Sequence, residues 1–449
     1  MANVSMKAKE LGNGVMVCMS VDTKHLQDAI DKAATCAEGG LFTLYVQNRF
    51  RSFETTAGKT EMTRCALVST CATAQAMASL YATVRTFKDG QPAHAGVEKT
   101  VEVVLQKEFA ADIAACEGFP QVVIGITSAG INIQAQNAEN DERAFFIALS
   151  EEAPARFPKE GGPENVEFAV DGSEFAEAVQ LAAAGAYEPE KGGNLVSFLP
   201  EITAGGDVEL NAVGFDRCCA ARATVKVLEV SEDHEHLRAF IDGFCPLDAK
   251  RLQSLISVEG LKGSGSKIKL RIFGSDRSAG KVKYQRVDIL VGENVYMLVV
   301  SSQQVPAGVL KFFGTGQSNV VMTVDVKPLI KAISVAEIGS GKGSAVTLAV
   351  ENGGLRISDN TATHTAKCMK VKITSAPEGA SVTCGTGMLK NALRAGGDSV
   401  ELRFLNGGLD PIRVSTVKGW QVVFMPVSEK AESKEDTAPG ENDAPEDAE

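Results

Sequence analysis

The stretch Thr323–Lys342, TVDVKPLIKAISVAEIGSGK, decides how the chain is organised, because its pattern occurs three times. The same order appears in Ser20–Gly40, SVDTKHLQDAIDKAATCAEGG, and in Ala169–Gly193, AVDGSEFAEAVQLAAAGAYEPEKGG. Each copy reads as the end of a strand, an Asp, three variable residues, and then Leu or Phe in a helical pattern. The three Asp residues lie 149 and 154 residues apart. That spacing is too long for a solenoid repeat and indicates three copies of a whole domain.

The helix in the third copy has a physical basis. Its apolar residues recur on one face at helical spacing, whereas Lys327 and Lys331 fall on another face. Asp325 precedes the first turn, where its carboxylate can accept from free backbone N–H groups. Pro328 lies in that first turn, where a missing N–H costs little. The glycine-rich run Gly339–Gly343 is expected to end the helix.

Composition indicates an ordinary soluble, cytoplasmic protein. No apolar run reaches the ~20 residues that a membrane helix needs. The N-terminal residues MANVSMKAKELGNG have no apolar core typical of a secretory signal. The ten cysteines form no C-x-x-C pair, and Cys218 and Cys219 are adjacent, which suits neither an ordinary disulfide nor a zinc site. We therefore expect reduced thiols.

The chain is acidic, but unevenly so. Its net charge is −12, of which Glu429–Glu449 contributes −7 through nine acidic residues and two lysines. Such a segment, with Pro and Gly and no apolar periodicity, is predicted to be disordered. A mildly acidic body does not exclude nucleic-acid binding, because what matters is whether basic side chains gather on one surface.

The order of elements predicts an α+β fold in three tandem copies. Each copy reads strand–helix–strands twice, so two helices pack on antiparallel sheet in every domain. The sequence Ala72–Phe87 is rich in helix formers and precedes a loop-like run, so it is interpreted as an insertion; residues 1–14 are expected to form a loose arm. The second helices are expected at Gln106–Gly118, Pro246–Val258 and Gly387–Ala395. The predicted domains are residues 15–158, 165–305 and 318–428, followed by a disordered acidic tail at 429–449.

This order resembles the bacterial sliding clamp, the β subunit of DNA polymerase III. The junction Ala155–Ala169 is similar to the family's linker, and Leu210–Ala221 is similar to its second-domain strand. Leu355–Asn360 resembles the third-domain strand, and Gln421–Val427 carries the terminal Met-Pro signature. The resemblance spans about residues 15–427. It implies a homodimer of three-domain chains, joined head to tail into a ring around duplex DNA.

Two departures indicate a divergent member, cellular or phage-encoded. Where the family has Gly-His-Arg in the second-domain strand, this chain has Arg217-Cys218-Cys219. The family ends near the Met-Pro signature, whereas this chain continues into the acidic tail. The implied function is a processivity factor that encircles duplex DNA without sequence preference and tethers the replicative polymerase. Polymerase and clamp loader would bind through peptide motifs. The alternative is a clamp-like interaction scaffold that does not load on DNA.

Basic residues on or just after the expected helices are the candidates for DNA contact. The alternative is that they belong to ordinary solvated helix faces, and Glu174 and Glu177 on the second copy's first helix weaken the DNA interpretation. Contacts with phosphates would give salt-sensitive binding that permits sliding. The predicted DNA-facing set is Lys24, Lys32, Lys107, Lys191, Lys250, Arg251, Lys327, Lys331, Lys342, Lys390 and Arg394.

The resemblance also implies a pocket for partner peptides between the second and third domains, although the same residues could be plain core. Phe424, which alternates with them, is expected to face the other way. The predicted pocket residues are Val196, Phe215, Arg217, Cys218, Val423, Met425 and Pro426.

No motif predicts catalysis, a metal or a cofactor. Gly339–Ser344 lacks the first glycine and the Ser or Thr of a phosphate loop, so it is interpreted as a helix-ending loop. His234-Glu235-His236 would need further ligands to hold a metal. No nucleophile elbow or catalytic carboxylate pair is recognisable. The sequence therefore predicts a protein that is not an enzyme.

Overall fold

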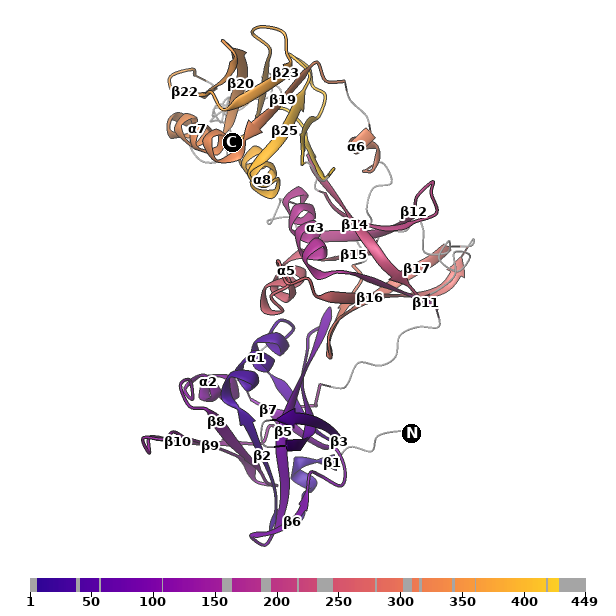
Figure 1. The fold of residues 1–449 in the computed structure, drawn as a ribbon, viewed down its shortest axis with the longest axis vertical. Helices are drawn as coiled ribbons and strands as arrows, with labels where there is room; N and C mark the ends of the chain where they lie inside the picture. The colour runs from indigo at the N-terminus through magenta and orange to yellow at the C-terminus, as the bar shows by residue number, and fades with distance from the viewer. Residues whose placement is uncertain are drawn as a thin grey trace, which may run out of the picture. The chain divides into compact units, whose positions relative to one another are not determined.

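The computed structural model divides into two compact units (Figure 1). Unit 1 comprises Met1–Gln180, Asn194–Ala212 and Thr224–Val305, and unit 2 comprises Leu181–Gly193, Val213–Ala223 and Pro306–Glu449. The structure describes residues 6–37, 41–55, 58–106, 108–155, 164–186, 195–215, 218–231, 245–278, 281–301, 309–314, 317–340, 344–359, 361–416 and 419–427. In this part of the chain, no helix is long and apolar enough to cross a membrane.

The first third of the chain holds two helices and ten strands among the described residues. Its elements are β1 (Met6–Lys7), η1 (Ala8–Glu10), β2 (Val15–Asp22), α1 (Thr23–Ala34), β3 (Phe42–Thr55), β4 (Gly58–Thr70), β5 (Ala74–Lys88), β6 (Gln91–Ala95), β7 (Val101–Leu105), α2 (Glu108–Ala114), β8 (Gln121–Ile126), β9 (Gly130–Gln136) and β10 (Glu142–Ala148).

The remaining elements repeat this order. The middle third holds β11 (Glu164–Asp171), α3 (Gly172–Gly185), β12 (Leu195–Ile202), β13 (Val208–Phe215), β14 (Cys219–Val230), β15 (Cys245–Asp248), α5 (Ala249–Val258), β16 (Lys267–Ser278), β17 (Lys281–Val291) and β18 (Asn294–Val299). The last third holds α6 (Lys311–Gly314), β19 (Val320–Asp325), α7 (Val326–Ser340), β20 (Ala345–Glu351), β21 (Gly354–Asp359), β22 (Thr365–Cys368), β23 (Val371–Ser375), β24 (Ser381–Gly385), α8 (Thr386–Ala395), β25 (Ser399–Phe404), β26 (Ile412–Ser415) and β27 (Gln421–Phe424).

Strand pairing confirms three tandem copies of one α+β fold. The strand before the first helix of each copy has an antiparallel neighbour on both sides: β2 lies between β5 and β8, β11 between β14 and β16, and β19 between β23 and β25. The strand before the second helix pairs with the strand after the first: β7 with β3, β15 with β12, and β24 with β20. The predicted domain boundaries stay predictions.

The helix starts follow from the capping residues. The carboxylate of Asp22 accepts from the backbone N–H of His25 at 2.9 Å. Asp171 does the same for Ser173 and Glu174, both at 2.9 Å. These contacts satisfy N–H groups that a helix start leaves without partners. Two of the three repeated Asp residues are thus confirmed as caps.

The buried faces also follow the expected periodicity. In α1 the buried apolar residues are Leu26, Ala29, Ile30 and Ala33, and in α7 they include Leu329, Ile333 and Ala336. Lys327, Lys331 and Ser334 of α7 are exposed, as predicted. Figure 1 shows α1 and α7 packed against the sheets of their own units. Burial of these apolar stripes, rather than helix propensity alone, holds the helices in place.

The interpretation of Ala72–Phe87 as a helix-like insertion is wrong. These residues form β5, which pairs with both β4 and β2, and its side chains alternate between buried and less buried positions. Small residues such as Ala76, Ala78 and Ala82 are fully buried where the sheet packs closely. Tertiary packing has overridden helix propensity here. The following run forms β6, which pairs with the end of β5.

Four smaller expectations also need correction. The arm predicted as loose contains β1, which pairs with β7, and Leu11, which is buried. The sequence pattern of Thr365–Ile373 predicts one strand, but this stretch forms two: β22 pairs with β21, whereas β23 pairs with β19 in another sheet. The helix expected from Pro246 starts at Ala249, because Cys245–Asp248 forms β15. Strand β24, before α8, had no prediction.

Within unit 1, the first two copies of the fold are joined by continuous sheet and by a polar cluster. Strand β18 pairs antiparallel with β5. The carboxylate of Glu293 accepts from Arg51 at 2.6 Å and from the hydroxyl of Tyr81 at 2.7 Å. Helix α1 contacts α5, so the helices of the two copies adjoin as well. Charge-assisted hydrogen bonds of this kind hold the junction in one arrangement.

Candidate functional site

Eight of the eleven predicted DNA-facing residues lie in the described part of the chain, and five of these eight are exposed. Lys107, Lys191 and Lys342 lie outside the described residues. All five exposed side chains are on helices, where they can contact a ligand. Lys327 forms a surface ion pair with Asp398 at 3.4 Å, and an exposed pair of this kind is weak. The exposed set is Lys24, Lys250, Lys327, Lys331 and Arg394.

The other three predicted residues have partners within the protein. Lys32 forms ion pairs with Asp28 at 2.8 Å and Glu259 at 3.4 Å. Burial alone would lower the pKa of Lys32, but the hydrogen bond to Asp28 and the charge of Glu259 raise it. The Nη1 of Arg251 donates to the carbonyl of Thr35 at 3.2 Å. These side chains hold α1 against α5.

Lys390 has a similar structural role in unit 2. Its ammonium pairs with the carboxylate of Glu337, and both side chains are largely buried, so the pair joins α8 to α7. Removing one partner would leave an uncompensated charge in this position. Lys390 therefore stabilises the fold whatever else it contacts.

Charge is unevenly distributed among the helices. Helices α5 and α8 carry basic residues and no acidic ones, and α7 carries two lysines and one glutamate. In contrast, α2 carries Glu108 and Asp112, and α3 carries Glu174 and Glu177. Positive charge is thus concentrated on α5, α7 and α8, and the absence of lysine from α3 agrees with the weaker case that its two glutamates gave for that helix.

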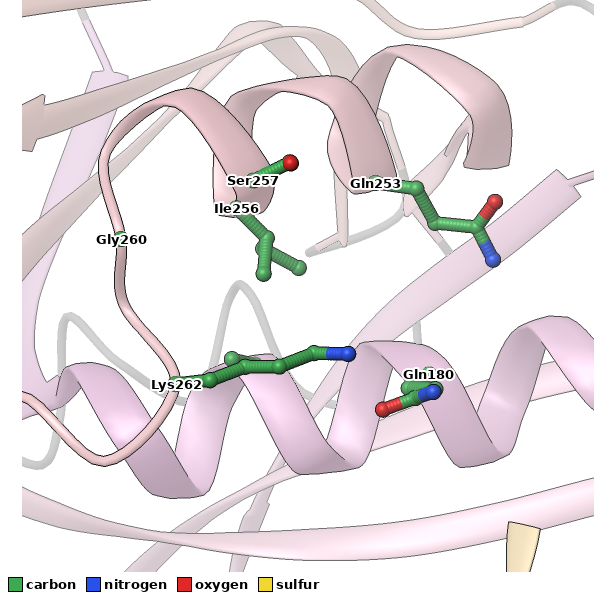
Figure 2. Close-up of a pocket in the computed structure, with 7 residues that line it drawn as sticks. Gln180, Gln253, Ile256, Ser257, Gly260 and Lys262 are labelled. Carbon is green, nitrogen blue, oxygen red and sulfur yellow. The ribbon is translucent and has the colours of Figure 1, made fainter. Parts of the chain in front are cut away.

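A groove between α3 and α5 was not anticipated from the sequence (Figure 2). It has a volume of about 440 Å³ and is lined by side chains of both helices and of the loop that follows α5. Lys262, in that loop, is exposed. The loop carries no helical pattern, so a search restricted to helix faces could not find this lysine.

A small apolar pocket lies in unit 2, where β27 pairs with the start of β14. Cys219 faces Phe424 and Ala220 faces Val423 across this pairing, and the backbone N–H of Met425 donates to the carbonyl of Cys218 at 2.9 Å. The pocket has a volume of about 20 Å³. Its lining residues are Cys218, Cys219, Ala220, Val309, Phe312, Val423, Phe424 and Met425.

Three of the predicted pocket residues, Cys218, Val423 and Met425, come together here. Val196 does not: it is fully buried on β12, opposite Leu247, and its position is that of a core residue in unit 1. Phe215 and Pro426 are half-buried and do not line the pocket, and Arg217 lies outside the described residues. Phe424, expected to face away, does line it.

Besides Phe424, sequence reasoning missed Cys219 and Ala220 at the start of β14. It also missed Val309 and Phe312, which come from the segment containing α6. Val309 is buried, whereas Phe312 is 41% exposed. This segment contacts β27. The signal was an apolar cluster, VLKFF at residues 309–313, inside a stretch interpreted only as a linker.

One edge of the first copy is acidic and has an exposed apolar centre. Strand β10 pairs only with β9 among the described residues, so its other edge is free. Phe146 on β10 is 62% exposed. Helix α2 packs beside β10, and burial together with the Glu108 carboxylate raises the pKa of Asp112. Because burial is the larger cause of this shift, the acidic character of the edge rests on its composition, in which Glu108, Asp112 and Glu142 outnumber Arg143.

One edge of the third copy has the opposite charge. Strand β22 ends its four-stranded sheet, and α7 packs beside it. Ile338 on α7 is 74% exposed, and Met369, just after β22, is 62% exposed. Around them, Lys367, Lys370 and Lys372 are exposed. This edge is therefore basic around an apolar centre.

Comparison with protein-family models and with curated proteins finds no match. Comparison with solved structures finds several matches over nearly the whole chain. The DNA polymerase III β chain of Streptococcus pneumoniae matches with a TM-score of 0.67 at 10% identity, over 92% of this chain and 100% of that one. The β sliding clamp of Caulobacter crescentus, with a polyethylene glycol bound to its putative β-motif tethering region, gives 0.65 at 17% identity, over 92% and 100%.

The DNA polymerase III β subunit of Thermotoga maritima gives a TM-score of 0.65 at 15% identity, over 92% of this chain and 99% of that one. The likeness therefore extends across all three copies of the fold and almost the full length of each neighbour. The chain has the three-copy fold of the bacterial DNA polymerase III β subunits, the DNA sliding clamps.

Proposed function

We propose that this chain is a DNA sliding clamp, a processivity factor without catalytic activity that encircles duplex DNA and tethers a replicative polymerase. The observation that supports this most is the threefold repeat of one α+β unit, matched over 92% of the chain by sliding clamps. We further propose that the three copies correspond to domains at residues 15–158, 165–305 and 318–428, with residues 429–449 as an acidic tail.

The decisive experiment is retention on circular DNA. A ring that encircles DNA should stay on a nicked circular plasmid during gel filtration and leave when the plasmid is cut, because its hold is topological. A clamp-like scaffold that does not load on DNA is the second candidate, and the acidic residues on α2 and α3 favour it. Such a scaffold would show no difference between circular and linear DNA.

We propose that the ring is a homodimer closed by two equal head-to-tail contacts. The β10 edge of the first copy, which exposes Phe146, is acidic, and the β22 edge of the third copy, beside which α7 exposes Ile338, is basic. The two edges are complementary in charge, and each offers unpaired backbone groups and apolar surface. A second copy of this chain is therefore the partner that fits both edges.

A cytoplasmic location is also proposed. All ten cysteines are free thiols, and seven of them are buried. Burial raises the pKa of the Cys65 thiol to about 12, which keeps it protonated and unreactive. Cysteine used as a small apolar core residue is typical of a reducing compartment.

We propose that the small pocket of unit 2 is the centre of the partner-peptide site. Its volume, about 20 Å³, accommodates little more than one water molecule. An apolar anchor of a peptide can enter only if a lining side chain moves. Phe312 is the lining residue best able to do so, because it is partly exposed on a four-residue helix.

Substituting Met425→Ala should weaken binding of a polymerase C-terminal peptide by more than ~1 kcal/mol, since a few buried apolar contacts dominate such sites. The fold should be unaffected, because the hydrogen bond of Met425 to Cys218 uses the backbone. Calorimetry with the peptide measures this. Met62→Ala, a change of another half-buried methionine on β4, is the matched control. If wild type and Met425→Ala bind the peptide with equal affinity, the peptide site is not this pocket.

Substituting Phe312→Ala should tighten peptide binding about fivefold, or ~1 kcal/mol, because the peptide no longer has to displace a partly buried aromatic ring. The same calorimetric titration measures the change. Leu409→Ala alters another exposed apolar residue of unit 2 outside the pocket and should leave the affinity unchanged. Weaker binding by Phe312→Ala would instead make Phe312 a fixed wall of the peptide site.

A further inference from the structure

The groove between α3 and α5 is polar along its rim and apolar at its base. Gln180 comes from α3, Gln253 and Ser257 from α5, and Lys262 from the loop after α5, while Ala176 and Ile256 line the base. Figure 2 shows Lys262 extending across the space between the two helices, with its ammonium toward Gln180. The groove is therefore lined by carboxamides, a hydroxyl and an ammonium.

The loop that carries Lys262 is fixed by the way in which α5 ends. The N–H of Gly260 donates to the carbonyl of Ser257 at 3.1 Å, and the N–H of Leu261 donates to that of Ile256 at 3.2 Å. This pair of bonds is a Schellman motif, and it requires the positive φ of 58° that Gly260 adopts. Leu261 is fully buried. Lys262 therefore starts from an anchored backbone position.

The same loop is tied to the opposite helix. The N–H of Gly263 donates to the hydroxyl of Ser173, in the first turn of α3, at 3.0 Å. The loop thus links the end of α5 to the start of α3 and sets the position of Lys262 relative to Gln180. A loop backbone fixed in this way loses little backbone entropy when the groove binds a ligand.

The chemistry of the lining favours an anion. No carboxylate lines the groove: Glu177, one turn before Gln180 on α3, is not among the lining residues. The two carboxamides and the hydroxyl can each donate or accept a hydrogen bond, whereas the ammonium of Lys262 only donates, so the charge of Lys262 makes the groove select an anion. A phosphate oxygen accepts from all of them, and Lys supplies the compensating charge. Lys250 is exposed on the same helix, α5, and adds positive charge to this surface.

We propose that this groove seats a phosphate of the DNA backbone, with Lys262 as the ion-pairing residue and Gln180, Gln253 and Ser257 as neutral hydrogen-bond donors. The inference rests on the proposed clamp function. It adds to the helix lysines a phosphate contact made by Lys262, in the loop after α5. It accounts for how α3, which carries two glutamates and no lysine, can face a polyanion. A contact of this kind is independent of base sequence.

The test measures the salt dependence of binding. Fluorescence anisotropy with a labelled linear duplex is recorded between 50 and 200 mM salt for the wild type, Lys262→Gln and Lys226→Gln. Lys226 is an exposed lysine of β14 outside the groove and is the matched control. Loss of one phosphate contact should lower the slope of log K against log[salt] by about 0.9. The ratio of the wild-type binding constant to that of Lys262→Gln should therefore be about threefold smaller at 200 mM than at 50 mM salt.

A second variant, Gln180→Glu with Gln253→Glu, places two carboxylates in the groove and should weaken binding further by repelling the phosphate. An unchanged slope for Lys262→Gln, in a protein whose wild type binds the duplex, would overturn this inference alone. A wild type that binds no linear duplex at any salt concentration would also overturn this inference, whereas retention on the nicked circular plasmid tests the proposed function separately. Equal slope losses in Lys262→Gln and Lys226→Gln would also overturn the inference, since the effect would then be one of net charge.

Discussion

Reversing Lys250, Lys327, Lys331 and Arg394 to Glu should abolish both duplex binding and polymerase stimulation while leaving the protein folded and dimeric. All four side chains are exposed on α5, α7 or α8, where the helices are most basic. Each phosphate contact contributes about 0.9 to the salt slope, so losing four lowers it by about 3.6. Binding at low salt should fall by about two orders of magnitude or more.

The fourfold variant leaves out the basic residues that stabilise the fold, so a loss of binding should not come from unfolding. Lys390 is left unchanged because its partner Glu337 is largely buried, and Lys390→Glu would place two carboxylates together. Arg251 is left unchanged because it donates to the carbonyl of Thr35 at the α1–α5 contact. Anisotropy with linear duplex and a primer-extension processivity assay measure the two effects, and circular dichroism checks the fold.

A matched control carries the same change in net charge elsewhere. Lys59, Lys88, Lys99 and Lys226 are exposed on strands and loops, and their reversal to Glu alters the total charge equally. If both fourfold variants lose binding to the same extent, the effect is long-range repulsion and the DNA-facing assignment is wrong. Single substitutions to Ala should change processivity little, because each contact is weak and a closed ring holds DNA by topology.

The sequence allowed the repeat, the fold class and the starts of the first helices to be predicted, because these depend on local signals. Asp22 and Asp171 cap their helices as short-range hydrogen-bond chemistry requires. The alternation of β5 was also present in the sequence, yet its alanines favoured a helix. Only the packing of β5 between β2 and β4 decides that these small residues belong to a sheet.

The site was less predictable, because it depends on contacts between distant segments. Val196 was assigned to the pocket by resemblance, but pairing with Leu247 places it in a core. Phe312 and Lys262 lie in segments without periodic pattern, and their positions follow from α6 meeting β27 and from the Schellman motif at Gly260. Neither contact has a signature in the local sequence strong enough to be identified in advance.

Substituting Ile338→Glu should convert the proposed dimer to monomer. Ile338 is 74% exposed on α7 beside the β22 edge, so the change should cost little in the isolated chain. In a dimer, full burial of an isoleucine contributes about 1.5–3 kcal/mol. The new carboxylate would also face the acidic β10 edge of the partner. Because a closed ring contains two such contacts, the dimerisation constant should weaken by about three orders of magnitude or more.

Sedimentation equilibrium at micromolar concentration measures this, and thermal unfolding checks that the variant is folded. Leu409→Glu is the matched control, because Leu409 is also exposed, at 63%, in unit 2 but lies in the loop between β25 and β26. It should remain dimeric. A wild type that is monomeric under these conditions would argue against a self-closing ring, and a dimeric Ile338→Glu would move the interface away from α7.

The charge complementarity of the two edges can be tested separately by exchanging the charges between them. Reversing Lys367 and Lys370 to Glu should weaken the dimer, because these exposed lysines would then oppose the acidic edge around α2 and β10. Adding Glu108→Lys and Glu142→Lys to the same chain restores opposite charges across both contacts of the ring. Recovery of the dimer in the fourfold variant, but not in either double variant, is the result expected of direct pairing. No recovery would mean that the two edges do not face each other.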